Sequence, residues 1–392
     1  MKILTVNAGS SSLKFSLFCL PEEQELVNGY FERIGTDGSF YTLKIGSQKL
    51  KKELAIADHL AAIEVVKQEL ISNNIIKSLD EIGAVGHRVV HGGMYYSKSA
   101  IVNDELLENV KSCNDLAPLH NPANITGIEA FLSALPNTIN VAVFDTAFHQ
   151  TMDSVEYLYP CSYEWYEKYQ VRKYGFHGTS HKFIDLSISE HLSRDDLKVI
   201  SCHLGSGASI CAIDSHRSVD TSMGFTPLPG IMMGTRSGDI DPTVIPFVME
   251  KENKSVDEVI NDLNKNSGLL GISGVSADSR DIEDGVAAGN ERCILAQNMF
   301  VSRIANYIAM YNNRLEGADV ICFTAGIGER AILVRKMIVG RLKSLGVHLD
   351  EERNKIFGEF GLISTDDSKI AVYVVPTDEE LMIARDTYEL AK

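Results

Sequence analysis

The sequence has no excess of basic residues, no long apolar run and little cysteine. It contains 37 Lys and Arg against 53 Asp and Glu, which gives a formal net charge of −16. Because nucleic acids and anionic membranes are bound through basic surfaces, this charge argues against both as partners. No apolar stretch approaches the roughly 20 residues that a membrane helix requires. We expect a cytoplasmic protein without a targeting segment or a lipid anchor.

The seven cysteines are scattered along the chain, and no two of them form a CxxC pair. This spacing argues against the common zinc and dithiol motifs and favours buried thiols in a reducing compartment. The chain has 392 residues. Since that length exceeds what one ordinary hydrophobic core supports, we expect two domains.

The amino-terminal residues predict a hairpin with a polar tip. Ile3 to Val6 forms an apolar run, Lys14 to Phe18 alternates, and small residues separate the two. Groups suited to a phosphate or a hydrated metal ion gather at this turn: Asn7, Gly9, Ser10, Ser11, Ser12 and Lys14. A solvated, Ser-rich turn is the alternative, so a functional interpretation needs a second element.

The stretch from Val199 to Ile213 supplies that element, because it repeats the same design. Ser10 and Ser206 occupy matching positions 196 residues apart, half of the 392-residue chain. Such a repeat predicts a duplicated fold with a ligand cleft between its halves. A third small-residue turn, Phe323 to Arg330, follows another apolar strand. Three such turns at strand ends indicate a nucleotide.

Two charged residues stand out at predicted strands. Arg88 interrupts an apolar run, and burying an unpaired charge in such a run costs free energy. We therefore favour an anion-binding role for Arg88 over a solvated arginine on an edge strand. The neighbouring His87 and His91 can equally well be structural. Asp145 follows the buried strand Ile139 to Phe144, at the end where parallel sheets place their chemistry. A simple turn cap is the alternative for Asp145.

Further candidates lie in loops. His177 sits in a loop bracketed by glycines, and Arg236 lies in a Gly and Ser loop ahead of two aspartates. The loop of His177 suggests an imidazole held close to a ligand, although a lone histidine is more often structural. For Arg236, the surrounding glycines favour close approach to a ligand over a plain ion pair. His120 either belongs to the site or only holds its own loop in place. The acidic turn from Asp378 to Glu380 is a magnesium candidate, or a set of solvated carboxylates at a helix start.

Apolar spacing also predicts the helices. The expected ranges are Leu54 to Leu79, Asn103 to Leu116, Asn121 to Leu135, Ser180 to His191 and Glu291 to Leu315. In the first of these, Leu60, Ile63, Val66 and Leu70 should face the core. Asn121 and Pro122 are expected as N-cap and N1 of their helix.

The sequence resembles the acetokinase family over essentially its whole length. The motifs that carry the resemblance are, in order, VNAGSSSLKF, GHRVVHGG, APLHNPAN, DTAFHQTM, YGFHGTSH, HLGSGAS, MGTRSGDIDP, FTAGIGER and PTDEELMIARDT. The resemblance implies an α/β fold of the sugar kinase, Hsp70 and actin superfamily, with two duplicated βββαβαβα domains and an interdomain nucleotide cleft. Residues 1–150, completed by helix 380–392, would form the first domain, and residues 151–379 the nucleotide-binding domain.

The same resemblance implies a function. The family uses magnesium, or manganese in its place, and ATP to phosphorylate acetate reversibly, giving acetyl phosphate and ADP, and it works as a homodimer. The implied catalytic residues are Arg88, Asp145, His177 and Arg236. The implied acetate pocket contains Arg88, Val90, Leu119, His120, Phe176 and Pro227, and the implied metal residues are Asn7 and Glu379. The implied nucleotide contacts are Ser10, Ser12, Lys14, His203, Leu204, Gly205, Ser206, Gly207, Asp278, Ser279, Arg280, Gly326, Ile327, Gly328, Glu329 and Arg330.

The chain departs from the family pattern twice. Ser206 replaces the usual asparagine of HLGNG, and Arg330 replaces the usual asparagine of GIGEN. Ser206 keeps a donor with less reach, and Arg330 either adds an anion contact or points to solvent.

The alternative functions are a kinase for propionate or another short acid, a sugar kinase, or a non-catalytic, nucleotide-driven hinge protein. A sugar kinase needs a base and a polar pocket, whereas the expected pocket is apolar. A hinge protein does not need Arg88, His177 and Arg236 together. The sequence contains no Walker A motif and no protein-kinase HRD or DFG motif.

Overall fold

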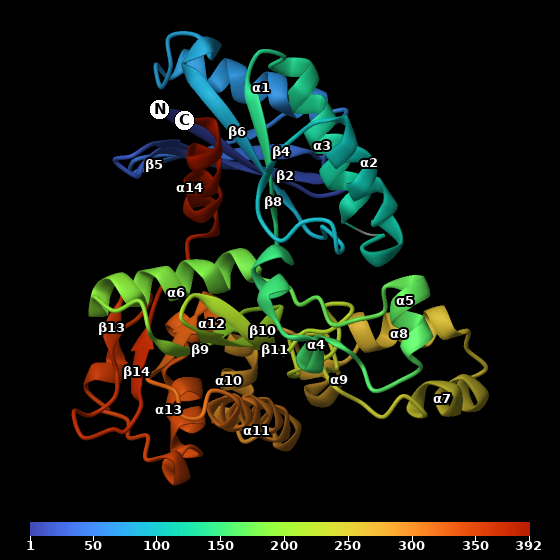
Figure 1. Ribbon diagram of the computed structural model, residues 1–392, viewed down its shortest axis with the longest axis vertical. Coiled ribbons are helices and arrows are strands. Elements are labelled where there is room, and N and C mark those ends of the chain that lie inside the picture. The colour runs from blue at the N-terminus through green and yellow to red at the C-terminus, as the bar shows by residue number, and fades with distance from the viewer. Residues whose placement is uncertain (119) are drawn as a thin grey trace. The chain divides into compact units, whose positions relative to one another are not determined.

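The computed structural model describes residues 1–118 and 120–392, so Leu119, expected in the acetate pocket, lies outside the described residues. The chain divides into two compact units (Figure 1). The first unit comprises Met1–Gln150 and Asp378–Lys392, and the second comprises Thr151–Thr377. No helix in the described part of the chain is long and apolar enough to cross a membrane.

The first unit is built on an eight-stranded sheet in the order β5-β4-β3-β2-β1-β6-β8-β7. Strands β1 to β5 pair antiparallel in succession, whereas β6 pairs parallel with both β1 and β8. The strands are β1 (Lys2–Ala8), β2 (Ser12–Cys19), β3 (Gln24–Glu32), β4 (Phe40–Ile45), β5 (Gln48–Glu53), β6 (Ile82–Val89), β7 (Ala100–Ile101) and β8 (Ile139–Phe144).

Helices cover both faces of this sheet. The helices are α1 (His59–Ser72), α2 (Asp104–Ser112), α3 (Asn121–Ala134) and α14 (Glu379–Ala391). Neighbouring residues of a strand point to opposite faces. Accordingly, Leu4 packs in one core cluster with Ile63 of α1, whereas Ile3 packs in another with Ala384 of α14. The carboxyl-terminal helix therefore completes the core of the amino-terminal unit.

The second unit repeats the central topology of the first. Its sheet has the order β11-β10-β9-β12-β14-β13, with β9, β10 and β11 antiparallel and β9, β12 and β14 parallel. The strands are β9 (Lys198–Leu204), β10 (Ala208–Asp214), β11 (Arg217–Thr221), β12 (Val320–Thr324), β13 (Gly361–Leu362) and β14 (Ala371–Val374). The limits of β1 and β9 differ by the same 196 residues that separate Ser10 from Ser206. The α/β fold and its duplication are thereby confirmed.

The remaining helices belong to the second unit, with the following bounds. They are α4 (Ser154–Tyr157), α5 (Tyr163–Tyr169), α6 (Gly178–Leu192), α7 (Val244–Glu252), α8 (Val256–Lys265), α9 (Gly268–Ser273), α10 (Ser279–Ala287), α11 (Glu291–Arg314), α12 (Ala325–Arg330) and α13 (Ile332–Gly340). Short 3-10 turns, in either unit, span Leu79–Glu81, Asn114–Leu116, Ala147–Thr151, Lys343–Leu345 and Arg353–Lys355.

Three helix predictions were wrong in detail. The helix expected from Asn103 to Leu116 ends at Ser112, and Asn114–Leu116 forms a separate 3-10 turn. The helix expected from Leu54 to Leu79 is only α1, because the Asp58 side chain accepts a hydrogen bond from Ala61 N and so caps its start. Leu60 is 48% exposed and does not belong to the core face. His59 turns inward in its place, since its Nε2 lies 2.8 Å from Gly9 O.

The expected cap at Asn121 was also wrong. Its side chain instead clamps the backbone of His91: Oδ1 accepts from His91 N at 3.1 Å, and Nδ2 donates to His91 O at 3.0 Å. His120 takes the N-cap position without a side-chain cap bond, so Pro122 lies in the first turn but one position after the expected N1. Asn121 therefore supports the loop after β6.

Candidate functional site

The turn between β1 and β2 presents its serines to solvent. Gly9 N donates to Ser12 O at 2.9 Å and closes the turn. A Cβ on Gly9 would lie 2.6 Å from Ser12 Oγ, so the turn has no room for another residue there. Ser10, Ser11 and Ser12 are exposed. The hydroxyls of this turn are thus available to a ligand, as a phosphate-binding tip requires.

Arg88 and Asp145 form an ion pair at the ends of two neighbouring strands. Arg88 Nε donates to Asp145 Oδ1 at 3.1 Å, and Nη2 donates to Oδ2 at 2.5 Å. The parallel register of β6 and β8 sets Arg88 opposite Val143, two residues before Asp145. Burial lowers the pKa of Arg88, but the carboxylates of Asp145 and Glu379 outweigh it and raise the pKa overall. The guanidinium is therefore held firmly charged.

Glu379 stands at the start of α14 near the same pair. Burial raises its pKa to about 7, with Asp145 and Glu380 adding to the rise and Arg88 and Lys14 opposing it. Lys14 forms an ion pair with Glu380. Glu379, Asn7 and Lys14 line one cavity of about 10 Å³ together with Arg88. That volume holds about one water molecule.

The oxygen donors of this cavity suit magnesium. Mg²⁺ prefers oxygen ligands, uses few carboxylates, and completes its shell with water and substrate phosphates. Asn7 and Glu379 offer one amide and one carboxylate oxygen donor of this kind. The described residues contain no cluster of three or more His, Cys, Asp or Glu that could hold a metal by itself. Burial is the main cause of the raised pKa of Glu379, and a cation here would favour the ionised carboxylate against both burial and the charges of Asp145 and Glu380.

A larger cavity of about 360 Å³ opens beside Arg88 in the first unit. Val90 and His120 line it, together with the hairpin residues Ser12 and Lys14. The wall is fixed by Asn124, whose Oδ1 accepts from Val90 N at 3.0 Å and whose Nδ2 donates to Ala8 O at 2.8 Å. Asn124 lies in the APLHNPAN motif, and sequence reasoning assigned it no role.

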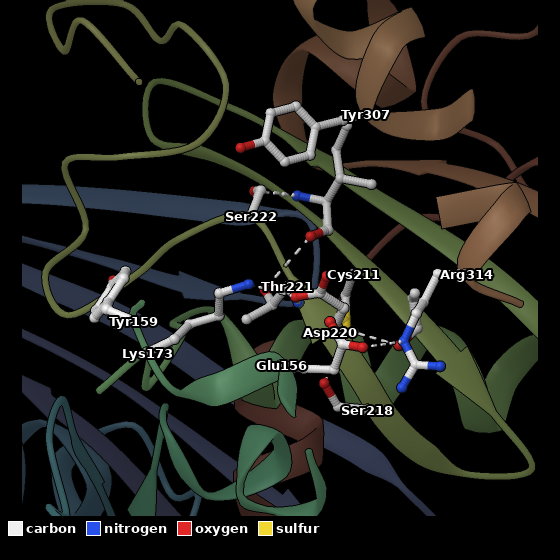
Figure 2. Close-up of polar contacts among 12 residues, drawn as sticks. Glu156, Tyr159, Lys173, Cys211, Ser218, Asp220, Thr221, Ser222, Tyr307 and Arg314 are labelled. Atoms are coloured by element: carbon white, nitrogen blue, oxygen red, sulfur yellow. Dashed lines mark hydrogen bonds and ion pairs between the residues drawn. The ribbon is translucent and has the colours of Figure 1, made fainter. Parts of the chain in front are cut away.

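In the second unit, the loop before α6 carries Phe176 and His177. Lys173 Nζ lies 2.5 Å from Asp220 Oδ1 on β11 and ties the loop to the sheet (Figure 2). The N–H groups of Tyr174 and Gly175 both donate to Gly224 O. His177 itself has a left-handed backbone, with a φ of 58°. The loop is therefore held by side-chain and backbone contacts ahead of the helix.

Arg236 is a half-buried cation in the second unit, and among the described residues its guanidinium contacts neutral groups. Nη1 donates to Pro227 O at 3.2 Å and lies 3.7 Å from Met233 Sδ. Burial lowers its pKa. The loop is closed by Asp239, whose Oδ1 accepts from Gly230 N at 2.8 Å. A guanidinium without a carboxylate partner is the arrangement expected for anion binding.

Gly207 lies where Arg236 and His177 come together. A Cβ on Gly207 would lie 3.4 Å from Arg236 Nη1 and 3.6 Å from His177 Nε2. His203 stacks on His177, with ring centroids 4.2 Å apart and an interplanar angle of 23°. The structure thus brings together three motifs that are distant in the sequence.

The predicted nucleotide loops line a cavity of about 580 Å³ in the second unit. The lining residues are Gly205, Ser206, Ala277, Asp278, Ser279, Arg280, Glu283, Gly326, Ile327, Arg330, Ala331 and Phe357. Arg280 pairs with Asp278 at 2.5 Å, and the Arg330 guanidinium lies 6.0 Å from the Phe357 ring centroid. Both departures from the family pattern, Ser206 and Arg330, therefore lie at this cavity.

Some predicted nucleotide residues do not line this cavity. Of the residues that the structure describes, His203, Leu204, Gly207, Gly328 and Glu329 are outside its lining. Leu204 is fully buried, Gly328 O accepts from Arg335 Nη1, and Glu329 Oε1 accepts from Thr377 N. Gly328 and Glu329 therefore hold neighbouring segments of the second unit together.

The predicted acetate pocket is divided between the units. Val90 and His120 line the cavity of the first unit, whereas Phe176 and Pro227 belong to the second. The predicted nucleotide residues Ser10, Ser12 and Lys14 also belong to the first unit.

The acetokinase family model matches residues 2–385 of the chain. The chain belongs to the acetokinase family. It is 52% identical to the acetate kinase of Bacillus cytotoxicus over 391 residues, covering 99% of this chain and 98% of the relative. It is 51% identical to that of Halalkalibacterium halodurans, covering 99% and 100%.

Solved acetokinase structures have the same fold. The acetate kinase of Porphyromonas gingivalis is 43% identical, covers 100% of both chains and superposes with a TM-score of 0.96. A propionate kinase from Francisella tularensis is 43% identical, covers 99% of both chains and has a TM-score of 0.94. The solved relatives thus include an acetate kinase and a propionate kinase.

Proposed function

We propose that this chain is a magnesium-dependent acetate kinase that transfers the γ-phosphoryl group of ATP directly to acetate, reversibly, giving acetyl phosphate and ADP. The relatives named acetate kinase, at about half identity over nearly the whole chain, support this proposal. The observation that carries it is Arg88, a charged guanidinium paired with Asp145 beside a cavity that Val90 lines.

Arg88 is suited to a small carboxylate. Asp145 occupies the Nε and Nη2 groups of the guanidinium, so an acetate would bind at its Nη1 side. The apolar Val90 offers a surface for the methyl group. Because acetate is already ionised at neutral pH, the reaction needs no general base. We therefore assign Asp145 the role of orienting Arg88.

Arg236 and His177 are suited to the transferred phosphoryl group. Phosphoryl transfer depends mainly on positioning and on stabilising negative charge over the equatorial oxygens. Arg236 offers a cation that no carboxylate neutralises in the described residues, and His177 Nε2 lies close to the same point near Gly207. The cavity of about 580 Å³ has the size of a nucleotide site, so residues 151–379 would form the nucleotide-binding domain.

Magnesium would be held by Asn7 and Glu379, with water and phosphate oxygens completing its shell. When bound, it would neutralise charge on the phosphates; manganese can serve in its place. We also propose that the protein works in the cytoplasm as a homodimer, with no nucleic-acid or membrane partner. Sedimentation of the purified chain tests the homodimer.

One assay tests the proposed reaction. Purified protein is incubated with ATP, MgCl₂ and acetate, and acyl phosphate is trapped with hydroxylamine as the hydroxamate. We expect hydroxamate only when all three are present, and ATP formation from acetyl phosphate and ADP. ATP hydrolysis without hydroxamate would instead support a nucleotide-driven hinge protein.

A second candidate is a propionate kinase, because one solved relative is a propionate kinase. One methylene in an apolar pocket changes binding by roughly 1–3 kcal/mol, so propionate should react more slowly than acetate but measurably. The assay with formate, acetate, propionate and butyrate distinguishes the two. A higher kcat/KM for propionate than for acetate would reassign the substrate.

A further inference from the structure

Behind His177 runs a chain of alternating serines and histidines. His177 Nδ1 lies 2.9 Å from Ser209 Oγ, and the same Oγ lies 2.8 Å from His181 Nε2. His181 Nδ1 in turn lies 2.9 Å from Ser201 Oγ. Ser201, His181 and Ser209 are fully buried. We refer to Ser201, His181, Ser209 and His177 as the serine–histidine chain.

The elements of the second unit explain this geometry. His181 follows His177 by one turn, so both imidazoles lie on the same side of α6. Ser201 and Ser209 come from the paired strands β9 and β10. The chain therefore rests on a helix and a sheet, and only His177 reaches the loop that precedes the helix.

Counting hydrogens limits how this chain can be arranged. A serine hydroxyl donates one hydrogen bond, so Ser209 can donate to one of its two imidazole neighbours at most. If Ser209 donates to His177 Nδ1, a neutral His177 carries its hydrogen on Nε2. If Ser209 donates to His181, then His177 donates from Nδ1, and a neutral His177 has no hydrogen on Nε2.

The surroundings of His177 favour the first arrangement. Arg236 Nη1 and His177 Nε2 both approach the Cβ position of Gly207, at 3.4 and 3.6 Å. A nearby guanidinium disfavours a second positive charge, so His177 should be neutral. Because Nδ1 of His177 faces Ser209, a neutral His177 can donate to a phosphoryl oxygen only when its hydrogen is on Nε2. Without that hydrogen, the Nε2 lone pair would face the oxygen and repel it.

We propose that Ser209 is a positioning residue that keeps the hydrogen of His177 on Nε2, and that His181 and Ser201 orient Ser209 for this task. Ser201 donates to His181 Nδ1, His181 Nε2–H donates to Ser209, and Ser209 donates to His177 Nδ1. All bonds of the chain then run in one direction toward the ligand, an order that strengthens each of them. The inference rests on the proposed function for the contact of His177 with the phosphoryl group.

Kinetics of hydroxyl deletions provide the first test. Ser209→Ala should lower kcat by about 10- to 100-fold, since a histidine in the wrong tautomer is a poor donor. The KM values for acetate and ATP should stay within about twofold. Ser209→Thr keeps the hydroxyl and should recover most of the activity. Ser201→Ala removes the far end of the chain and should give an intermediate loss.

The matched control is Ser222→Ala. Ser222 is another buried serine of the same unit (Figure 2). Its Oγ accepts a hydrogen bond from Ile210 N, and Ser222 is not a member of the serine–histidine chain. Its loss should lower Tm with little change in kcat. If Ser209→Ala behaves in the same way, with lower Tm and wild-type kcat, then Ser209 is only structural and the proposal is wrong.

A spectroscopic test reads the tautomer directly. Two-bond ¹H–¹⁵N spectra of histidine-labelled full-length protein distinguish Nε2–H from Nδ1–H, and His177→Gln assigns the signal. We expect Nε2–H in the wild type at pH 7.5 and a shift toward Nδ1–H in Ser209→Ala. An Nδ1–H tautomer in the wild type would overturn the proposal, even if Ser209→Ala did not fold.

The two proposals fail separately. If the wild type forms no acyl phosphate, the proposed function fails while the spectra still report the direction of the serine–histidine chain. If acyl phosphate forms normally in Ser209→Ala, the kinase assignment stands and the role of Ser209 does not.

Discussion

Arg88 and Asp145 meet through two hydrogen bonds, at 3.1 and 2.5 Å, across the neighbouring parallel strands β6 and β8. The side chain of Asp145 is 2% exposed. A carboxylate this buried depends on its partner, so the pair should affect both catalysis and folding.

Removal of Arg88 should therefore have two effects. Arg88→Ala should lower kcat/KM for acetate by ~10³ or more, as loss of an arginine finger does in other phosphoryl transferases. It should also lower the free energy of unfolding by about 3 kcal/mol, because Asp145 loses its partner. Hydroxamate assays and urea unfolding measure the two effects. Arg88→Lys keeps a charge without the paired geometry and should remain well below wild type.

Asp145 should act as an orienting group and not as a base. Asp145→Asn should lower kcat but leave the shape of the pH–rate profile unchanged, since an ionised acetate needs no deprotonation. The profile is measured from pH 5.5 to 9 in both proteins. A single limb near neutrality that disappears in Asp145→Asn would contradict the assignment.

Arg236→Ala should lower kcat by ~10³ or more. It should not lower Tm, because the variant removes a half-buried cation that has no carboxylate partner in the described residues. Arg341→Ala, which changes an exposed arginine of the same unit, is the control and should keep wild-type kcat. Near-wild-type turnover in Arg236→Ala would refute its role.

Glu379 should determine the magnesium requirement. Glu379→Gln should raise the Mg²⁺ concentration for half-maximal activity by about tenfold or more, since a carboxylate ligand is replaced by a neutral amide. Glu389→Gln, an exposed position on the same helix, is the matched control. The measurement is a titration with MgCl₂ at fixed ATP, and equal curves for both variants would argue against a metal role.

Stability should fall in acid because of a buried histidine. Burial lowers the pKa of His87 to about 4, although its hydrogen bond with Asn140 opposes the shift. The unfolded chain, with an ordinary histidine pKa, takes up the proton first as pH falls. The free energy from neutral His87 is thus present above pH 6.5 and lost between pH 6.5 and 4, by about 2 kcal/mol at pH 5.

Urea unfolding at pH 7.5 and pH 5 measures this loss. His87→Gln keeps an N–H donor for Asn140 Oδ1 but cannot titrate. Its midpoint should therefore fall less between the two pH values than the wild-type midpoint. Equal falls would show that His87 does not titrate in this range.

The strands and the duplication could be predicted from the sequence. Ile139 to Phe144 is apolar except for Asn140 and is bounded by polar residues, and β8 has the same limits. The match between Ser10 and Ser206 reflects equal strand lengths in β1 and β9. The helix α11 was also predicted to within one residue, because its apolar period is long.

Contacts between distant segments could not be predicted. The inward position of His59 depends on Gly9 O, and the clamp role of Asn121 depends on the backbone of His91. Nothing in the local pattern around either residue encodes these partners. The hydrogen bond between Ser209 and His177 could not be predicted either. Both residues lie in recognised motifs, HLGSGAS and YGFHGTSH, but nothing in the sequence pairs them.

Between β11 and β12, the second unit inserts a long segment that holds α7 to α11 and the loop of Arg236. The corresponding connection from β3 to β6 in the first unit contains only β4, β5, α1 and a short 3-10 turn. A tandem chimera of two amino-terminal halves would therefore keep the strand order. It would lack Arg236 and the residues from Asp278 to Arg280, which line the cavity of the second unit.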